Sequence, residues 1–98
     1  MDFLETRYQK SPFVVFRKIV DEYVLVPIRK NVGDLESIYT LNEVGAEIWE
    51  QIDGKATLKQ IQDSLTDKFD ISQKEAGRDL IEFVKGLTDR NCITENKG

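Results

Sequence analysis

The spacing of apolar residues changes midway along the chain and divides it into two regions. Between Phe13 and Thr40 the sequence is rich in β-branched and aromatic residues, which favour strands. From Asn42 onward, apolar residues recur every three or four positions, which is the period of an amphipathic helix. The pattern therefore predicts a strand-rich first half and a helical second half.

Two apolar runs in the first half are separated by Asp21-Glu22, where we expect a turn. The turn-forming residues of segment 30–34 then lead to a third run. Neither of the first two runs alternates cleanly, because both faces carry apolar side chains. Pro27 has no backbone donor, which places its strand at an edge or near a bulge. The three predicted strands are Phe13–Val20, Tyr23–Ile28 and Leu35–Thr40.

Residues that can cap a helix precede three helical stretches. Asn42 is a candidate N-cap for the first, which ends at Gly54. Thr57 and Ser72 begin the second and third, and each has Gln or Glu three residues later, as in a capping box. The expected apolar stripes are Leu41, Val44, Ile48, Trp49 and Ile52; Leu58, Ile61, Leu65 and Phe69; and Ala76, Leu80, Phe83, Val84 and Leu87.

Three antiparallel strands followed by three helices predict an α+β domain of winged-helix-like form. A tight turn at Asp70-Ile71 joins the last two helices, and a short stretch, Cys92–Thr94, closes the fold. The 98 residues suffice for one domain with a modest core. We expect a single domain over 1–98, with 1–11 and 95–98 flexible.

Composition removes most routes to catalysis. The chain contains no histidine, the usual general base near neutral pH and the commonest metal ligand. Its single cysteine, Cys92, excludes an internal disulfide and is expected to be buried and unreactive. The serines lack a base, and the carboxylate pairs are read as solvated surface. We therefore expect no enzymatic activity, no cofactor and no metal; the pairs are Glu43 with Glu47 and Glu75 with Asp79.

Charge narrows the range of partners. The formal net charge is −4; residues 1–41 carry six basic and six acidic side chains, whereas residues 42–98 carry eight and twelve. An acidic half disfavours binding to nucleic acid, which depends on Lys and Arg contacts to phosphate. The N-terminal residues lack the basic and apolar segments of a signal peptide, and no apolar run approaches the length of about 20 residues that spans a membrane. We expect a soluble, cytoplasmic protein that binds neither nucleic acid nor membrane.

The third helix has an uncharged flank beside its core stripe. At about 100° per residue, the members of this flank fall within about 60° of one another. Two interpretations are open: a strand packs there, or the flank is one wall of a groove for an extended peptide. Leu35–Thr40 would supply the other wall, because an unpaired strand edge binds peptides by β-augmentation. The flank consists of Gly77, Ile81, Val84 and Thr88.

The helical half also carries an ordered sequence motif. Within 39–54 it reads Leu-Asn-Glu-x-Gly-x-x-Ile-Trp and then Asp-Gly, and three later segments follow in order and spacing. This pattern resembles the family of the pyrroloquinoline quinone synthesis protein D, the PqqD-like peptide chaperones. The resemblance covers about 13–93 and is strongest over 39–87. The later segments are Thr57–Ile61, Phe69–Ile71 and Asp79–Val84.

The resemblance implies a winged-helix-like RiPP recognition element. Such a module binds the leader of a ribosomally made precursor peptide and presents it to a radical S-adenosylmethionine enzyme, with the leader between the third strand and the third helix. It leaves open whether the pathway is pyrroloquinoline quinone (PQQ) biosynthesis or another peptide modification. Together with the groove above, it gives as peptide-binding residues Leu35, Glu36, Ser37, Ile38, Tyr39, Thr40, Gly77, Ile81, Val84, Lys85 and Thr88.

Two other functions remain as alternatives. A winged-helix transcription factor would read DNA with its third helix, but segment 73–90 has four basic and four acidic side chains, a balance of zero. A dimerisation domain would pair its exposed strand edge with a second copy, giving a homodimer. The apolar character of both faces of the first two strands is compatible with this second alternative.

Overall fold

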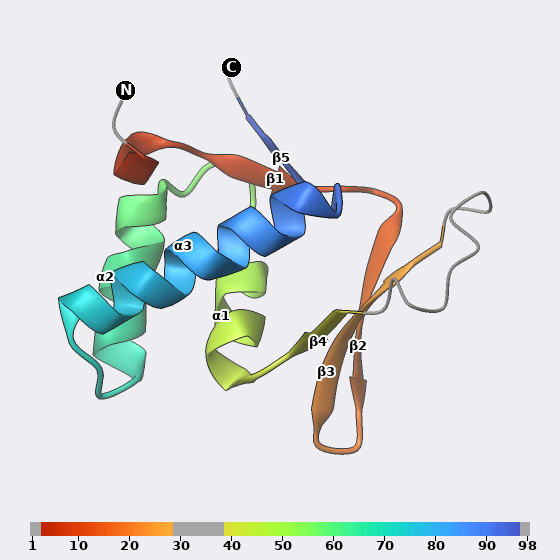
Figure 1. Cartoon of the computed structure of the whole chain (residues 1–98), viewed down its shortest axis with the longest axis horizontal. Coiled ribbons are helices and arrows are strands. Elements are labelled where there is room, and N and C mark those ends of the chain that lie inside the picture. Colours follow the sequence, from red (N-terminus) through yellow and green to blue (C-terminus); the bar gives the residue numbers. More distant parts are fainter. Residues whose placement is uncertain (1–2, 29–38, 97–98) are drawn as a thin grey trace.

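The computed structural model describes residues 3–28 and 39–96, which form an α+β domain (Figure 1). Antiparallel strands precede three helices, as the sequence predicted. The elements in chain order are η1 (Phe3–Glu5), β1 (Tyr8–Lys10), β2 (Val14–Ile19), β3 (Glu22–Pro27), β4 (Tyr39–Leu41), α1 (Glu43–Gln51), α2 (Leu58–Lys68), α3 (Gln73–Asp89) and β5 (Ile93–Glu95).

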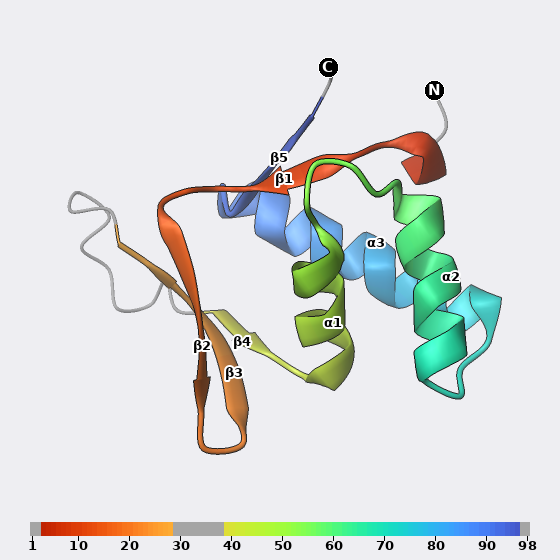
Figure 2. The same cartoon turned by 180° about the vertical axis from the view of Figure 1, so that it is seen from behind.

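The described strands form two antiparallel sheets. One has the order β2-β3-β4, and the other pairs β1 with β5. Figures 1 and 2 show the β2-β3 hairpin extending away from the helices, whereas β5 pairs antiparallel with β1 and leads to the C-terminus. β4 leads directly into α1, so the three-stranded sheet is joined to the helical half at this point.

Local capping explains where the helices begin. The Asn42 side chain accepts a hydrogen bond from the Gly45 backbone N–H at 2.7 Å. Thr57 forms the complete capping box, and Ser72 accepts from the Glu75 N–H at 3.1 Å. Of the two predicted boxes, the structure forms the reciprocal side-chain bond only at Thr57. Each cap satisfies an N–H that the first helical turn leaves without a partner, and all three predicted caps are confirmed.

The core lies among the three helices and the inner face of the β2-β3-β4 sheet. On α3 the predicted stripe is confirmed, because all five of its residues are buried. Leu80 and Leu87 are fully buried and contribute to the same cluster as Leu25 of β3. The largest fully buried side chains are Leu25, Ile48, Ile52, Leu58, Ile61, Leu65, Leu80, Leu87 and Ile93.

The first hairpin differs from the expectation. Ile19 pairs with Glu22, so the turn residues are Val20 and Asp21 rather than Asp21 and Glu22. Val20 has φ 55°, a left-handed conformation that a β-branched residue rarely adopts, so its sequence carried no signal for this turn.

The placement of Pro27 also differs. Its strand, β3, is the central strand of its sheet, not an edge strand. Pro27 is tolerated because it is the last residue of β3, beyond the last described β4 pairing, Leu25 with Tyr39. The predicted third strand over Leu35–Thr40 is described only from Tyr39, where β4 begins and runs to Leu41; residues 35–38 lie outside the described residues.

Residues 3–10 form more structure than the expected flexible segment 1–11. Tyr8–Lys10 pairs in register with Ile93–Glu95, and the preceding η1 packs against α2. The Gly54 N–H donates to the Tyr8 carbonyl at 2.8 Å and ties β1 to the α1–α2 connection. A three-residue strand is too short to show a period in the sequence, and its partner lies at the far end of the chain. Residues 1–2 and 97–98 lie outside the described residues.

A candidate peptide-binding cleft between β4 and α3

Tyr39 of β4 packs against one side of α3. Its ring meets that of Phe83 edge to face, with centroids 6.2 Å apart and an interplanar angle of 88°. The Arg90 guanidinium, at the end of the helix, lies 5.0 Å from the centre of the Tyr39 ring. A Cβ placed on Gly86 would stand 3.0 Å from the Tyr39 hydroxyl oxygen. The absence of a side chain at Gly86 therefore allows the strand to lie close to the helix.

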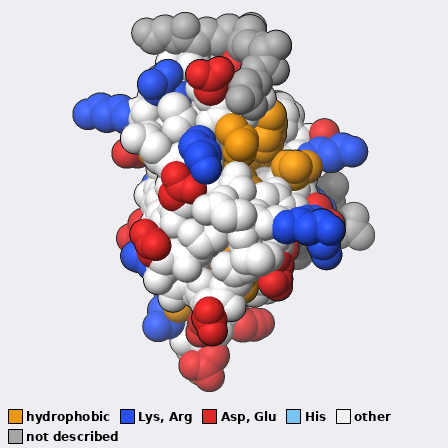
Figure 3. Space-filling view, turned by 90° about the vertical axis from the view of Figure 1, so that its left-hand side faces the viewer, with side chains coloured by type: hydrophobic (Ala, Val, Ile, Leu, Met, Phe, Trp, Pro, Cys, Tyr) orange, Lys and Arg blue, Asp and Glu red, His pale blue; other side chains and the backbone are white. Residues whose placement is uncertain are grey.

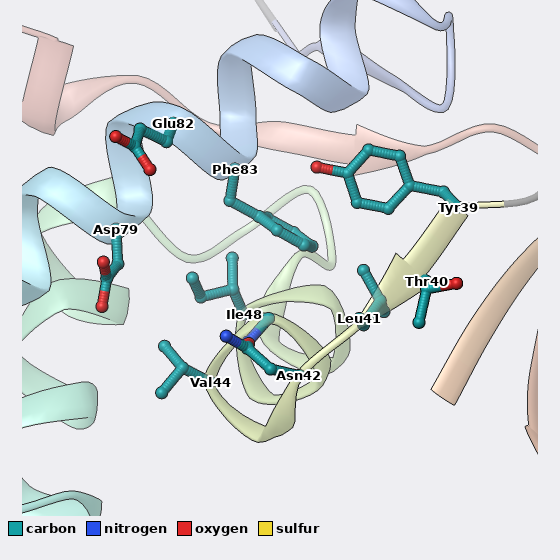
Figure 4. A pocket seen from close by; sticks show the side chains of 10 residues that line it. Tyr39, Thr40, Leu41, Asn42, Val44, Ile48, Asp79, Glu82 and Phe83 are labelled. Carbon is teal, nitrogen blue, oxygen red and sulfur yellow. The ribbon is translucent and has the colours of Figure 1, made fainter. Parts of the chain in front are cut away.

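A cleft of about 200 Å³ opens between β4, α1 and α3 (Figure 4). This volume is below the roughly 300–1,000 Å³ of typical small-molecule pockets. The cleft is thus sized for individual side chains of a longer ligand rather than for a whole cofactor. Its lining residues are Tyr39, Thr40, Leu41, Asn42, Val44, Gly45, Ile48, Asp79, Glu82 and Phe83.

The cleft has an apolar floor. Leu41, Ile48 and Phe83 are buried, and Val44 is half-buried beside them. A Cβ on Gly45 would lie 3.1 Å from Phe83 Cε1, so glycine at this position lets α1 approach the aromatic ring. The motif residues Asn42 and Gly45 thus position the floor: the asparagine fixes the start of α1, and the glycine sets its distance from α3.

In the part of the chain that the structure describes, one edge of β4 is unpaired. Among the described strands, β4 pairs only with β3, through Leu41 with Tyr23, Thr40 with Val24 and Tyr39 with Leu25. An unpaired edge presents backbone N–H and C=O groups that can pair with another extended chain. The cleft therefore combines backbone hydrogen-bonding groups along the strand with an apolar floor beside them.

Two carboxylates, Asp79 and Glu82, project from α3 at the rim of the cleft (Figure 4). They are three residues apart and hence neighbours on one helical face. Within 3–28 and 39–96 neither forms an ion pair or a side-chain hydrogen bond. None of the lining residues is Lys or Arg, so this end of the cleft is acidic.

The structure separates the two walls of the groove that the sequence predicted. Tyr39 and Thr40 line the cleft, but Gly77 and Ile81 line a different hollow, with Phe3 and Leu4. Of the remaining predicted residues, Val84 is buried, Lys85 is exposed, Thr88 donates its hydroxyl hydrogen to the Val84 carbonyl at 2.7 Å, and Leu35, Glu36, Ser37 and Ile38 lie outside the described residues.

The predicted strand wall and helix wall are separate because the predicted α3 residues lie on a different face of the helix from the face that meets β4. Asp79, Phe83, Gly86 and Arg90 follow one face at spacings of four, three and four residues, and this face meets β4. Ile81 is two residues from Asp79, which turns it by about 200° around the axis. The sequence signal for the α3 face that borders the cleft was this spacing around Phe83. It was missed because charged positions were left out of the candidate wall.

The cysteine and the carboxylates considered in the sequence show no sign of a catalytic or metal site in the described residues. Burial raises the pKa of the Cys92 thiol, against a smaller opposing effect of Arg90, as expected for an inert cysteine. Burial opposes ionisation of Glu47, but hydrogen bonds from Gln51 and Lys68 outweigh it and lower the pKa of its carboxyl group. Across residues 3–28 and 39–96, no three His, Cys, Asp or Glu side chains gather as metal ligands. No helix in the same part of the chain has the length and apolar character needed to cross a membrane.

Fold and site together define a small α+β recognition domain, in which an open strand edge and the third helix border one cleft. Residues 22–93 match the family of coenzyme PQQ synthesis protein D (PqqD), and the chain belongs to this family, as its motif indicated. Among solved structures it is similar to TbiB1 in complex with the TbiA(beta) leader peptide. The TM-score is 0.70 and the identity 25%, over 87% of this chain and 93% of that chain. No curated protein matches.

Proposed function

We propose that this chain is a non-catalytic module that binds the leader of a ribosomally made precursor peptide in the cleft between β4 and α3. The observation that carries the proposal is the open edge of β4 beside the apolar floor formed with Phe83. The similarity to TbiB1, a structure described as a complex with a leader peptide, supports it.

The leader adds to the sheet as a further strand next to β4. Since the described sheet is antiparallel throughout, we propose that the leader runs antiparallel to β4 as well. Its backbone pairs with the strand, and alternate side chains point into the cleft. Phe83, Ile48 and Val44 then receive one bulky apolar side chain of the leader.

The bound leader is delivered to a modifying enzyme, which we propose to be of the radical S-adenosylmethionine class. In this scheme the recognition domain supplies affinity and the enzyme supplies cofactor and chemistry. PQQ biosynthesis is one such pathway. In a reconstituted reaction, the enzyme should modify its precursor several-fold faster when this chain is present. An unchanged rate would contradict delivery while leaving leader binding intact.

Nuclear magnetic resonance tests where the leader binds. Isotopically labelled protein is titrated with synthetic leader peptides of short precursors encoded beside radical enzymes, with the TbiA(beta) leader as a reference. Amide shifts should concentrate in 39–45 and 79–86. A binding leader whose shifts fall instead around Gly77 and Ile81 would move the site to the opposite side of α3. Absence of shifts with every leader would contradict the proposed function.

Self-association is a second candidate, favoured by the exposed apolar side chains of the hairpin region. Phe13, Ile19 and Ile28 are each about half exposed. Ile19 ends β2 beside the hairpin turn, whereas Phe13 and Ile28 flank the other end of the hairpin, where the Ile28 N–H donates to the Phe13 carbonyl at 2.8 Å. We propose that a second copy covers these exposed apolar side chains. Sedimentation equilibrium should then show a dimer that Ile19→Lys converts to a monomer; a wild-type monomer at all concentrations would contradict it.

A further inference from the structure

Resting on the proposed function, we propose that the cleft selects leaders by the order of their charged residues. A Lys or Arg next to the bulky apolar side chain of the leader would bind Asp79 and Glu82. An Asp or Glu further along the leader would bind Arg90. Asp79 and Glu82 lie at one end of the cleft, which we call its acidic end, and Tyr39 lies on the other side of Phe83 (Figure 4). Arg90 does not line the cleft, but its guanidinium lies over the Tyr39 ring at 5.0 Å, and we call this side the basic end. An extended peptide that fills the cleft passes from one end to the other.

No Lys or Arg among the described residues lines the acidic end. In the described part of the chain, ion pairs join Lys59 to Asp63 and Lys68 to Glu47, both away from the cleft. Asp79 and Glu82 stand side by side on one helical face, and like charges at this spacing repel. A Lys or Arg of the ligand placed between them relieves this repulsion and adds an attraction of its own.

The basic end lies at Arg90, the C-cap residue that follows α3. The Arg90 Cζ lies over the Tyr39 ring, 5.0 Å from its centre, a cation–π contact that leaves the N–H groups of the guanidinium able to donate to a carboxylate. It is exposed, and no ion pair to it is formed in the described residues. It can therefore bind an acidic side chain of the peptide.

The geometry sets both order and spacing. Figure 4 shows Asp79 and Val44 on one side of Phe83 and Tyr39 on the other, so β4 runs from the basic end to the acidic end. In a leader that is antiparallel to β4, the N-terminal part lies near Asp79 and the C-terminal part near Arg90. Arg90, the C-cap of α3, is eleven positions after Asp79, about 16 Å at the helical rise, which an extended chain covers in about five residues. The basic residue thus precedes the acidic one by about five positions.

The test uses a randomised peptide library, from which binders are selected separately against the wild-type protein and against two variants. Asp79→Asn with Glu82→Gln removes the acidic end. The control, Glu50→Gln with Asp67→Asn, removes the same charge from exposed positions of α1 and α2 that do not line the cleft. A peptide selected on the wild type is then titrated into all three, with amide shifts recorded.

We expect Lys or Arg enriched at one position before an apolar residue, with the enrichment lost in the Asp79/Glu82 variant and kept in the control. Affinity for the selected peptide should fall about three- to tenfold in the first variant alone. Peptides that shift the cleft amides but show no charge preference, or the opposite order, overturn this inference and leave the proposed function standing. Failure to select any peptide, or shifts confined to other surfaces, overturns both.

Discussion

The two sides of α3 both present apolar surface, but only one borders a strand edge. On the β4 side, Tyr39 and Phe83 line a cleft of about 200 Å³. On the opposite side, Phe3, Leu4 and Ile81 line a hollow of about 620 Å³. Figure 3 looks onto that part of the molecule, where hydrophobic side chains gather at the surface among basic ones. The larger and more apolar depression is therefore the one without a strand.

The difference shows that apolar exposure alone does not define a peptide-binding site. An extended peptide carries a backbone N–H and C=O at nearly every residue, and these need partners when water is displaced. The edge of β4 can supply them. The hollow is bordered by α2 and α3, whose backbone groups are hydrogen-bonded within each helix. The hollow can receive side chains, but it offers an extended chain little backbone pairing.

The largest expected effect comes from the residue that lies between the two sides. Leu80 is fully buried in the core. Leu80→Asp places a charge there without a partner, which should cost about 4 kcal/mol or more and unfold this small domain. Circular dichroism during thermal unfolding measures the loss, with Leu80→Met as a control of similar volume. A cooperative transition of Leu80→Asp near the wild-type melting temperature would show that burial of Leu80 in the core is not needed for the stability of the domain.

The second-largest expected effect is a loss of leader affinity when Tyr39 is replaced. Tyr39→Ala removes the ring that meets Phe83 and Arg90 at the mouth of the cleft. We expect a leader that shifts the cleft amides to bind more weakly by about 1–3 kcal/mol, measured by calorimetry, because an aromatic contact is lost. Tyr39→Phe keeps the ring and should stay close to wild-type affinity. Equal affinities for all three proteins would place the leader away from β4.

The sequence predicted the helical half well because its signals are local. Asn42, Thr57 and Ser72 each bond to backbone within their own first turn, and the period of each apolar stripe follows from the helix alone. The β1–β5 pair was missed because it joins Tyr8 to Glu95, and three-residue strands carry no measurable alternation.

Of the residues that line the cleft, the sequence had named Tyr39 and Thr40 on the strand but none of those on α3. Tyr39 and Thr40 line the cleft because the strand leads into the Asn42 cap, a relation visible in the sequence. Which face of α3 meets that strand depends on how α1 packs under Phe83 through Gly45, a contact between distant residues. Periodicity gives the faces of a helix, but it does not say which partner each face meets.

Two glycines on opposite sides of α3 provide the sharpest comparison. Gly86→Ala puts a Cβ 3.0 Å from the Tyr39 hydroxyl, which forces the ring to move, whereas Gly77→Ala puts one 3.4 Å from Gln62 Nε2, close to ordinary contact. Both changes favour the helix by up to about 1 kcal/mol. We expect both proteins to be as stable as the wild type or more so. Leader affinity should fall several-fold for Gly86→Ala only; a fall for both or neither would remove the distinction between the sides.

The smallest expected effect is that of Ile81→Asp, one position after the residue whose change should unfold the domain. Ile81 is 52% exposed and lies on the side of α3 away from β4, so its replacement buries no charge. The new carboxylate would stand one turn from both Arg78 and Lys85, and these attractions offset part of the lost apolar contact with the hollow. We expect stability within about 1 kcal/mol of the wild type by thermal unfolding, and leader affinity within about twofold by calorimetry. A folded Ile81→Asp protein that binds the leader tenfold more weakly would put the peptide on the flank of Gly77 and Ile81 that the sequence first suggested. Unfolding comparable to that of Leu80→Asp would instead show that the hollow belongs to the core.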